Sequence, residues 1–300
     1  MPQRLIQRPF YPIVFVRGFA SGMDEVDRTT ATPYMGFNEG ATMIRQLWTG
    51  EVVKHVFESP LVRLMKDHGY RDVYEAGLSA EGAIPAKSVV IHRYYEESST
   101  DFGAGQKHAI EHYAQRLGEL IDQLRDQVCQ GDARARRDFR VYLVAHSMGG
   151  LICRCLLQND QIGRPETKRL VDKVFTYATP HNGIDFQLLG NVPAFLSINH
   201  VNNFSRPRMA RYLGLAADDR AAGRLARVDS LAGKFDPARF FCLVGTNFND
   251  YTVAHGLSSL AVGPMSDGLV AIRNATVEGS PRAFVHWSGS CSATCASTGC

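Results

Sequence analysis

The sequence contains no apolar run that approaches the roughly 20 residues needed to span a bilayer. Its first ten residues carry arginines and prolines, and the apolar core of a signal peptide does not follow them before the first strand. The seven cysteines are an odd number and lack the spacing of a disulfide framework. The net charge of +3 is spread along the chain, so nucleic-acid binding is not indicated. We therefore expect a cytoplasmic protein with reduced thiols.

The composition is that of a globular α/β protein. Of the 300 residues, 45% are hydrophobic and 21% are charged, which suits one large domain with insertions. Apolar periodicity predicts helices over Thr42–His55, Leu61–His68, Gln106–Cys129 and Gly150–Leu157. Short apolar runs predict buried strands over Pro12–Val16, Val89–Tyr94, Lys173–Tyr177 and Phe240–Val244, with a further run at Ala283–Val285. Cys153, Cys155 and Cys242 fall inside these elements, where cysteine acts as a small apolar residue.

The stretch Arg140–Gly150 organises the chain around Ser147. A β-branched run precedes this serine and a helical pattern follows it, which predicts a sharp strand-to-helix turn. Ala145 and Gly149 supply the small neighbours that such a turn needs, with alanine in the place where glycine is commoner. The turn lifts the serine hydroxyl above the sheet edge and aims the N–H of Met148 at a nearby oxyanion. The alternative is an ordinary turn with a buried serine.

Two further segments follow predicted strands and carry polar or small residues. Gly18 lets the backbone after the first strand approach a substrate, with the N–H of Phe19 as a second oxyanion donor, unless it only ends a strand. His181 lies in the segment that follows Lys173–Tyr177, and His146 adjoins the serine. Because parallel sheets bind ligands at the carboxyl ends of their strands, we expect Gly18, His146 and His181 to line the substrate site. The ring of His146 should point away from the nucleophile.

The segment of about 183–237 interrupts the alternation of strands and helices. Its first half is apolar, and its second half, Arg206–Lys234, has a helical pattern with scattered arginines. We interpret it as a cap or lid over the site, and as a candidate for peripheral membrane contact. The alternative is a set of helices that simply extends the core.

A reactive serine needs an imidazole to take its proton and a carboxylate to orient that imidazole. In α/β enzymes of this kind the acid and then the histidine follow the serine in the chain. Asp267 lies in a tight turn before an apolar pair and is the first candidate for the acid, ahead of Asp250 and Asp185. His286 is the only histidine after Asp267, and a structural role for it remains open.

Four blocks together resemble α/β-hydrolase lipases, and among these the GPI inositol-deacylase-like branch and related triacylglycerol lipases. The resemblance covers about residues 10–287. It implies an α/β-hydrolase fold with a mostly parallel central sheet and helices on both faces. It also implies ester hydrolysis through Ser147 and Asp267, with backbone donors at Phe19 and Met148, and no metal or organic cofactor. The blocks are Val14–Ala20, Ala145–Gly150, Ala178–Gly183 and Ser266–Val270.

The end of the chain departs from this pattern. Gly289, and not His286, aligns with the catalytic histidine of similar proteins, and residues 288–300 carry no charge and no large apolar side chain. We expect the hydrolase domain to cover 1–287 and the tail 288–300 to be disordered. The tail is either a non-homologous ending or a natural terminus with His286 as the base. A metal site on Cys291, Cys295 and Cys300 is the least favoured interpretation.

The first hypothesis is therefore a serine carboxyl-ester hydrolase that acts on acyl or lipid esters through an acyl-serine intermediate. Ser147, Asp267 and His286 are its expected catalytic residues. The first alternative is a catalytically impaired member of the fold that binds lipids or a partner. The second is an acyltransferase that uses the same nucleophile.

Overall fold

The computed structural model describes a central sheet, the helices around it and one separate hairpin. The described residues are 6, 8–18, 23–32, 34–38, 41–46, 48–73, 82–101, 103–184, 202–215, 227–245, 270, 272–285 and 294–295. Within these residues, no helix combines the length and the apolar composition that a bilayer crossing requires. About half of the predicted cap, residues 185–201 and 216–226, lies outside them.

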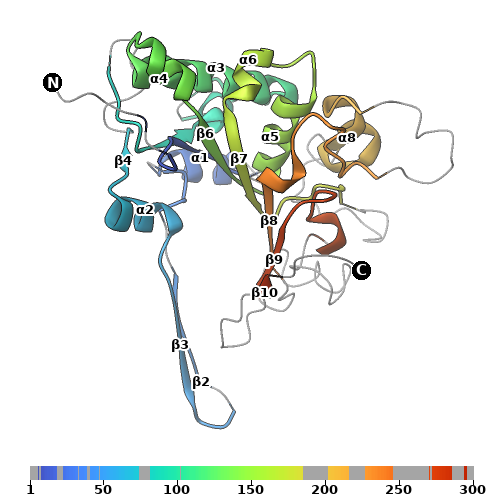
Figure 1. The fold of residues 1–300 in the computed structure, drawn as a ribbon. Helices are drawn as coiled ribbons and strands as arrows, with labels where there is room; N and C mark the ends of the chain where they lie inside the picture. Colours follow the sequence, from blue (N-terminus) through green and yellow to red (C-terminus); the bar gives the residue numbers. More distant parts are fainter. Residues whose placement is uncertain are drawn as a thin grey trace.

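The central sheet is mostly parallel, as predicted (Figure 1). Among the described residues it has eight strands, and every neighbouring pair is parallel except the last, β9 with β10. All four residues of β1 are buried, as expected for a strand covered on both faces. In sheet order the strands are β4 (Arg71–Asp72), β5 (Ser88–His92), β1 (Ile13–Val16), β6 (Val141–His146), β7 (Val171–Tyr177), β8 (Phe240–Gly245), β9 (Arg282–Val285) and β10 (Thr294–Cys295).

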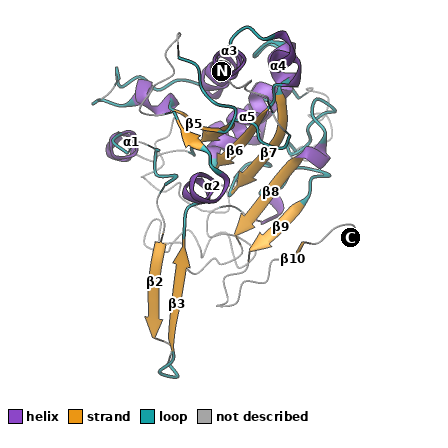
Figure 2. Ribbon diagram, turned by 60° about the vertical axis from the view of Figure 1, so that its left-hand side comes forward, coloured by secondary structure: helices purple, strands orange, loops and turns teal. Residues whose placement is uncertain are grey.

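Helices cover both faces of this sheet because its connections run in two directions. The chain crosses from β5 to β6 through α3 (Ile110–Cys129), and from β6 to β7 through α5 (Met148–Gln158). It leaves β1 the other way, toward β4, through α1 (Met23–Thr30) and α2 (Pro60–His68). Right-handed crossovers in opposite directions place their helices on opposite faces. Accordingly, Figure 2 shows α2 on the other side of the sheet from α5.

The two central helices pack closely on each other and on the sheet. α3 contacts α5, and α5 contacts β1, β6 and β7. The apolar face predicted for α3 is buried, including Leu117, Ile121 and Leu124. Cys153 and Cys155 of α5 and Cys242 of β8 are buried free thiols, as predicted. Short helices complete the described fold: α4 (Ala133–Asp138), α6 (Pro165–Arg169) and α8 (Arg206–Tyr212), with the 3₁₀ turns η1 (Tyr94–Ser98), η3 (Asn202–Phe204), η5 (Pro237–Arg239) and η8 (Ile272–Asn274).

One helix prediction was wrong. Thr42–His55 does not form a helix, because β2 (Ala41–Gln46) and β3 (Val52–Phe57) pair antiparallel as a hairpin. Its apolar positions fit both periods, and the β-branched residues and the positive φ of Gly50 favour the hairpin. Both ribbon views show this hairpin extending away from the sheet (Figures 1 and 2).

Within Arg206–Lys234, the described residues are helical only over α8. Gly214 and Gly233 have positive φ values, which end or interrupt a right-handed helix. By contrast, the prediction for Leu61–His68 is confirmed by α2. The hydroxyl of Ser59 accepts a hydrogen bond from the Leu61 N–H at its start, and Gly69 ends it in the left-handed conformation.

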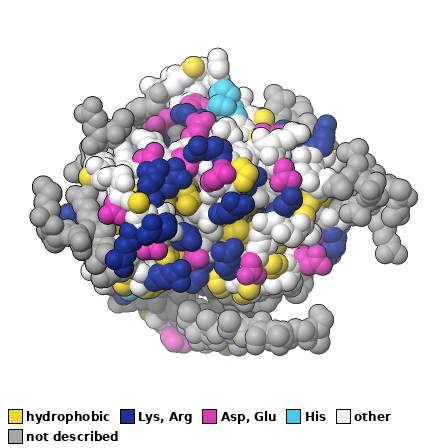
Figure 3. Space-filling view, turned by 45° about the horizontal axis from the view of Figure 1, so that its top comes forward, with side chains coloured by type: hydrophobic (Ala, Val, Ile, Leu, Met, Phe, Trp, Pro, Cys, Tyr) yellow, Lys and Arg dark blue, Asp and Glu magenta, His cyan; other side chains and the backbone are white. Residues whose placement is uncertain are grey.

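Charges of both signs are mixed on the surface. On the face shown in Figure 3, basic and acidic side chains of the described residues lie interspersed. Across the described residues, many charged side chains form exposed ion pairs, such as Arg63 with Asp67 and Lys234 with Asp160. Such pairs contribute little to stability individually, and their mixture prevents a strong field of one sign.

Candidate active site

Ser147 occupies the turn between β6 and α5, at the carboxyl edge of the sheet. Its φ of 52° and ψ of −126° are unusual for a residue with a side chain. Two contacts hold this conformation: the Ser147 N–H donates to the Tyr177 carbonyl at 3.0 Å, and the Thr179 hydroxyl donates to the Ser147 carbonyl at 2.8 Å. The residue is only partly buried. Strained backbone that the surroundings hold in place is typical of functional sites.

Small residues around Ser147 let three chain segments converge. A Cβ atom on Gly149 would lie 2.2 Å from the Val16 carbonyl oxygen, and one on Gly18 would lie 2.4 Å from the Ser147 Cβ. The loop after β1 therefore lies directly against the turn. The methyl group of Ala145 is fully buried, so alanine is accommodated at the position where glycine is commoner. This close approach is the steric requirement that the sequence pattern predicted.

Two buried tyrosines hold the loop after β1 in place. The Tyr94 hydroxyl donates to the Arg17 carbonyl at 2.7 Å, and the Tyr95 hydroxyl donates to the Gly18 carbonyl. Burial raises the pKa of Tyr94 well above its usual value, so this phenol remains a donor at neutral pH. The bond from Tyr95 thus anchors the Gly18 carbonyl, whose peptide group also includes the N–H that the sequence predicts as an oxyanion donor. Neither tyrosine was predicted as a site residue, although the two form an aromatic pair separated from the end of β5 by a single residue.

His146 lies beside Gly18, at the border of the site. A Cβ on Gly18 would lie 2.9 Å from the His146 Nδ1. The His146 ring also contacts Tyr177, with centroids 5.1 Å apart. Burial, with a smaller contribution from the Arg17 guanidinium, lowers the pKa of His146 to about 4. The imidazole is therefore neutral at physiological pH.

His181 lies in the protein interior, and its side chain has no exposed surface. Its Nε2 is 3.0 Å from the Thr176 hydroxyl, and its ring packs edge-on against Phe240. Burial, together with the nearby Arg154 charge, lowers the pKa of His181 well below its usual value. The described contacts suit a structural role, in contrast to the substrate contact expected from the sequence.

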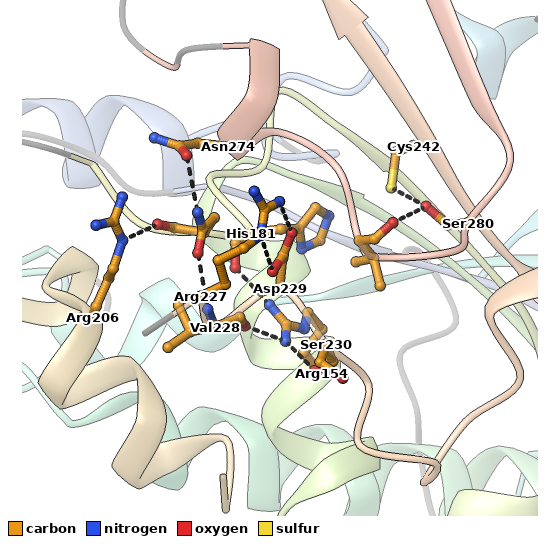
Figure 4. A network of polar contacts seen from close by, with 12 residues as sticks. Arg154, His181, Arg206, Arg227, Val228, Asp229, Ser230, Cys242, Asn274 and Ser280 are labelled. Carbon is orange, nitrogen blue, oxygen red and sulfur yellow. Dashed lines mark hydrogen bonds and ion pairs between the residues drawn. The ribbon is translucent and has the colours of Figure 1, made fainter. Parts of the chain in front are cut away.

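Arg154 of α5 binds the segments that contain His181 and Val228–Ser230 (Figure 4). Its guanidinium is fully buried and donates to the carbonyls of His181, Val228 and Ser230 and to the Gln158 side chain, at 2.7–2.9 Å. These bonds join α5 to two distant segments. Arg154 was not predicted either, although an arginine inside the apolar stretch of α5 indicates a buried polar contact.

The structure brings Gly18, His146, Ser147 and the first residue of α5, Met148, together at one edge of the sheet. The other expected site residues, Phe19, Asp267 and His286, lie outside the described residues, as do Asp185 and Asp250.

The mostly parallel sheet, with a serine on a strained turn between strand and helix, defines an α/β hydrolase fold. A family model described as "PGAP1-like alpha/beta domain" matches residues 11–209, more than half of the chain. The chain belongs to this family.

Similar proteins include bacterial lipases. A lipase of Staphylococcus epidermidis is 26% identical over 200 residues, covering 60% of this chain and 25% of the relative. Lipase 1 of Staphylococcus aureus strain N315 is 26% identical over 191 residues, covering 57% and 24%. The chain thus spans about a quarter of the length of these relatives.

Among solved structures, the mature lipase BlEst2 of Bacillus licheniformis has a TM-score of 0.45 at 15% identity, with 94% of this chain and 85% of that chain covered. The metagenomic carboxyl esterase MGS0156 has a TM-score of 0.47 at 12% identity, with coverage of 92% and 63%.

Proposed function

We propose that this protein is a serine carboxyl-ester hydrolase of the lipase or esterase type, acting on acyl or lipid esters. The observation that carries the proposal is the backbone of Ser147, held at a positive φ between β6 and α5 and pressed against Gly18. No structural need of the turn itself calls for a hydroxyl at this strained position. The relatives named lipases, at 26% identity, support the same class of reaction.

In the proposed mechanism the Ser147 Oγ attacks the ester carbonyl carbon while the His286 imidazole takes the hydroxyl proton. The tetrahedral intermediate then collapses: the bond to the alcohol oxygen breaks, and the alcohol leaves with that proton. Water next attacks the acyl-serine, again with His286 as the base, and releases the acid and free Ser147. Asp267 orients the imidazole and stabilises its cation.

The order of the strands supports this arrangement. β8 and β9 continue the parallel sheet beyond β7, so their last residues, Gly245 and Val285, lie at the same edge as Ser147. Asp267 lies between these two strands in the chain, and His286 directly follows Val285. Strand ends at one edge are where α/β enzymes gather residues from distant parts of the chain.

The oxyanion would bind to the N–H groups of Met148 and Phe19. The Met148 N–H is at the first residue of α5, where helical N–H groups have no partner within the helix and the helix dipole favours negative charge. The Phe19 N–H belongs to the peptide whose carbonyl Tyr95 binds. Two preset donors stabilise the developing charge without reorganisation in the transition state.

A fluorophosphonate probe tests the nucleophile directly. We expect covalent labelling of the wild-type protein and none of Ser147→Ala, while Ser230→Ala, whose residue lies away from the turn, labels normally. Labelling that survives Ser147→Ala overturns the proposal.

Turnover of p-nitrophenyl esters tests the base. We expect His286→Ala to lose turnover. If wild-type turnover is at background and Gly289→His raises it, the impaired-enzyme alternative holds instead. Product analysis with added alcohol separates hydrolysis from acyl transfer.

A further inference from the structure

A second cluster of reactive side chains joins η1 to the start of α3, apart from Ser147. The Glu97 Oε2 is 2.8 Å from the His112 Nε2 and 3.7 Å from the His108 Nε2. The two imidazole rings stack with centroids 4.2 Å apart. All three potential ligand atoms lie within 4.8 Å of one another.

The surrounding contacts hold these three residues in place. The Tyr113 hydroxyl accepts a hydrogen bond from the backbone N–H of His108 at 3.0 Å. It also lies 2.9 Å from the Oγ of Ser98, the residue after Glu97. The Arg116 Nε is 3.2 Å from the Glu97 Oε1. One carboxylate oxygen is therefore held by a cation, while the other faces both imidazoles. Outer contacts that orient a ligand in this way are typical of metal sites.

We propose that Glu97, His108 and His112 bind a divalent transition metal of the Zn²⁺ type, through the Glu97 Oε2 and the two Nε2 atoms. Zn²⁺ binds nitrogen and carboxylate oxygen at about 2.0–2.2 Å, which places tetrahedral ligands about 3.3 Å apart. The two Glu97–histidine distances, 2.8 and 3.7 Å, bracket that value. Two imidazoles favour Zn²⁺, Ni²⁺ or Cu²⁺ over Mg²⁺ and Ca²⁺, which prefer oxygen ligands alone.

The site is open to solvent and leaves one coordination position for water. Between 29% and 40% of each of the three side chains is exposed, so an ion can enter without rearrangement of the fold. Glu97 and Arg116 also line a pocket of about 670 Å³ beside the cluster.

The position of the cluster suggests what the ion does. η1 carries Glu97 on one side of the turn and, two and three residues earlier, Tyr95 and Tyr94, which bind the loop beside Ser147. A metal bound to Glu97 and α3 would fix η1 and thereby the loop. This consequence rests on the proposed function, whereas metal binding itself does not.

Calorimetry on metal-free, tag-free protein tests the site. Cys291, Cys295 and Cys300 are replaced by serine in every sample, because thiolates also bind Zn²⁺. We expect one Zn²⁺ per chain, a higher Tm with Zn²⁺ than without, and no effect of Mg²⁺. His68→Ala, which removes an exposed histidine at the end of α2, should bind like the parent.

His108→Ala, His112→Ala and Glu97→Gln should each weaken Zn²⁺ binding at least about tenfold. Co²⁺ gives a second readout, since its visible absorption reports tetrahedral nitrogen and oxygen ligands. The Tm of each metal-free variant shows whether it is folded. No stoichiometric binding by the parent, or unchanged binding by a folded His108→Ala/His112→Ala double variant, overturns the proposal. A failure here leaves the esterase test with Ser147→Ala unaffected.

Discussion

Replacing Gly18 by alanine is the sharpest structural test of the candidate active site. The added Cβ would lie 2.4 Å from the Ser147 Cβ and 2.9 Å from both the Nδ1 and the carbonyl oxygen of His146. Ordinary contacts of a Cβ atom begin at 3.4 Å. The loop after β1 and the turn at Ser147 must therefore separate by about 1 Å, because backbone and Cβ atoms cannot rotate out of the way.

This separation should lower both the catalytic rate and the free energy of unfolding. A displacement of about 1 Å between catalytic groups can lower the rate by about 100-fold, which corresponds to about 2.7 kcal/mol of transition-state stabilisation. Overpacking lowers the free energy of unfolding by about 1–3 kcal/mol. We therefore expect the kcat of Gly18→Ala to fall about 100-fold, with a moderate fall in Tm.

The assay is turnover of a short p-nitrophenyl ester, measured well below the Tm of each variant. The control is Gly118→Ala, where the added Cβ would lie 3.2 Å from the flexible end of the Leu156 side chain and at an ordinary 3.8 Å from the Gly163 Cα. This variant is expected to keep its kcat within about threefold of wild type. If folded Gly18→Ala also retains a kcat within threefold of wild type, the loop and the turn do not form the catalytic site together.

Three further predictions concern buried polar groups. Under the proposed mechanism, Tyr95→Phe should lower kcat about tenfold with little change in KM, because its hydrogen bond to the Gly18 carbonyl would orient the proposed oxyanion donor. Tyr70→Phe, whose hydroxyl donates to the Tyr11 carbonyl, should leave kcat unchanged. Arg154→Met should lower the free energy of unfolding in urea by at least about 2 kcal/mol, since the carbonyls of His181 and Val228 lose the arginine as a donor and the Ser230 carbonyl keeps only Gln158. Burial lowers the pKa of His92 and of His146 to about 4, against about 6.5 in the unfolded chain. The unfolded state thus binds more protons below pH 6.5, so urea melts should show stability falling as the pH drops from about 6.5 towards 4, with a shallower fall in His92→Gln.

The sequence by itself determined most strands of the central sheet, the two central helices and the position of Ser147. These features depend on interactions within a few residues. A β-branched run, a serine with small neighbours and an apolar helical stripe each leave a mark in consecutive positions. For the same reason, the capping contacts of α2 at Ser59 and Gly69 involve residues only a few positions apart.

A local sequence pattern does not determine the secondary structure where the helical and the strand period fit the same residues. Thr42–His55 matches a helical spacing, yet pairing between β2 and β3 decides its structure. The position of His181 after a strand of the sheet likewise does not determine whether its side chain reaches a substrate. Packing against Phe240 and Thr176 buries it.

Only the tertiary structure decided which distant residues meet. Tyr95 reaches Gly18 across 77 positions of the chain, and Arg154 reaches Ser230 across 76. His108 and His112 are close in sequence, but Glu97 joins them only because η1 packs beside the start of α3. Such contacts depend on how whole elements pack, and packing depends on the summed shape and burial of many side chains rather than on any short pattern.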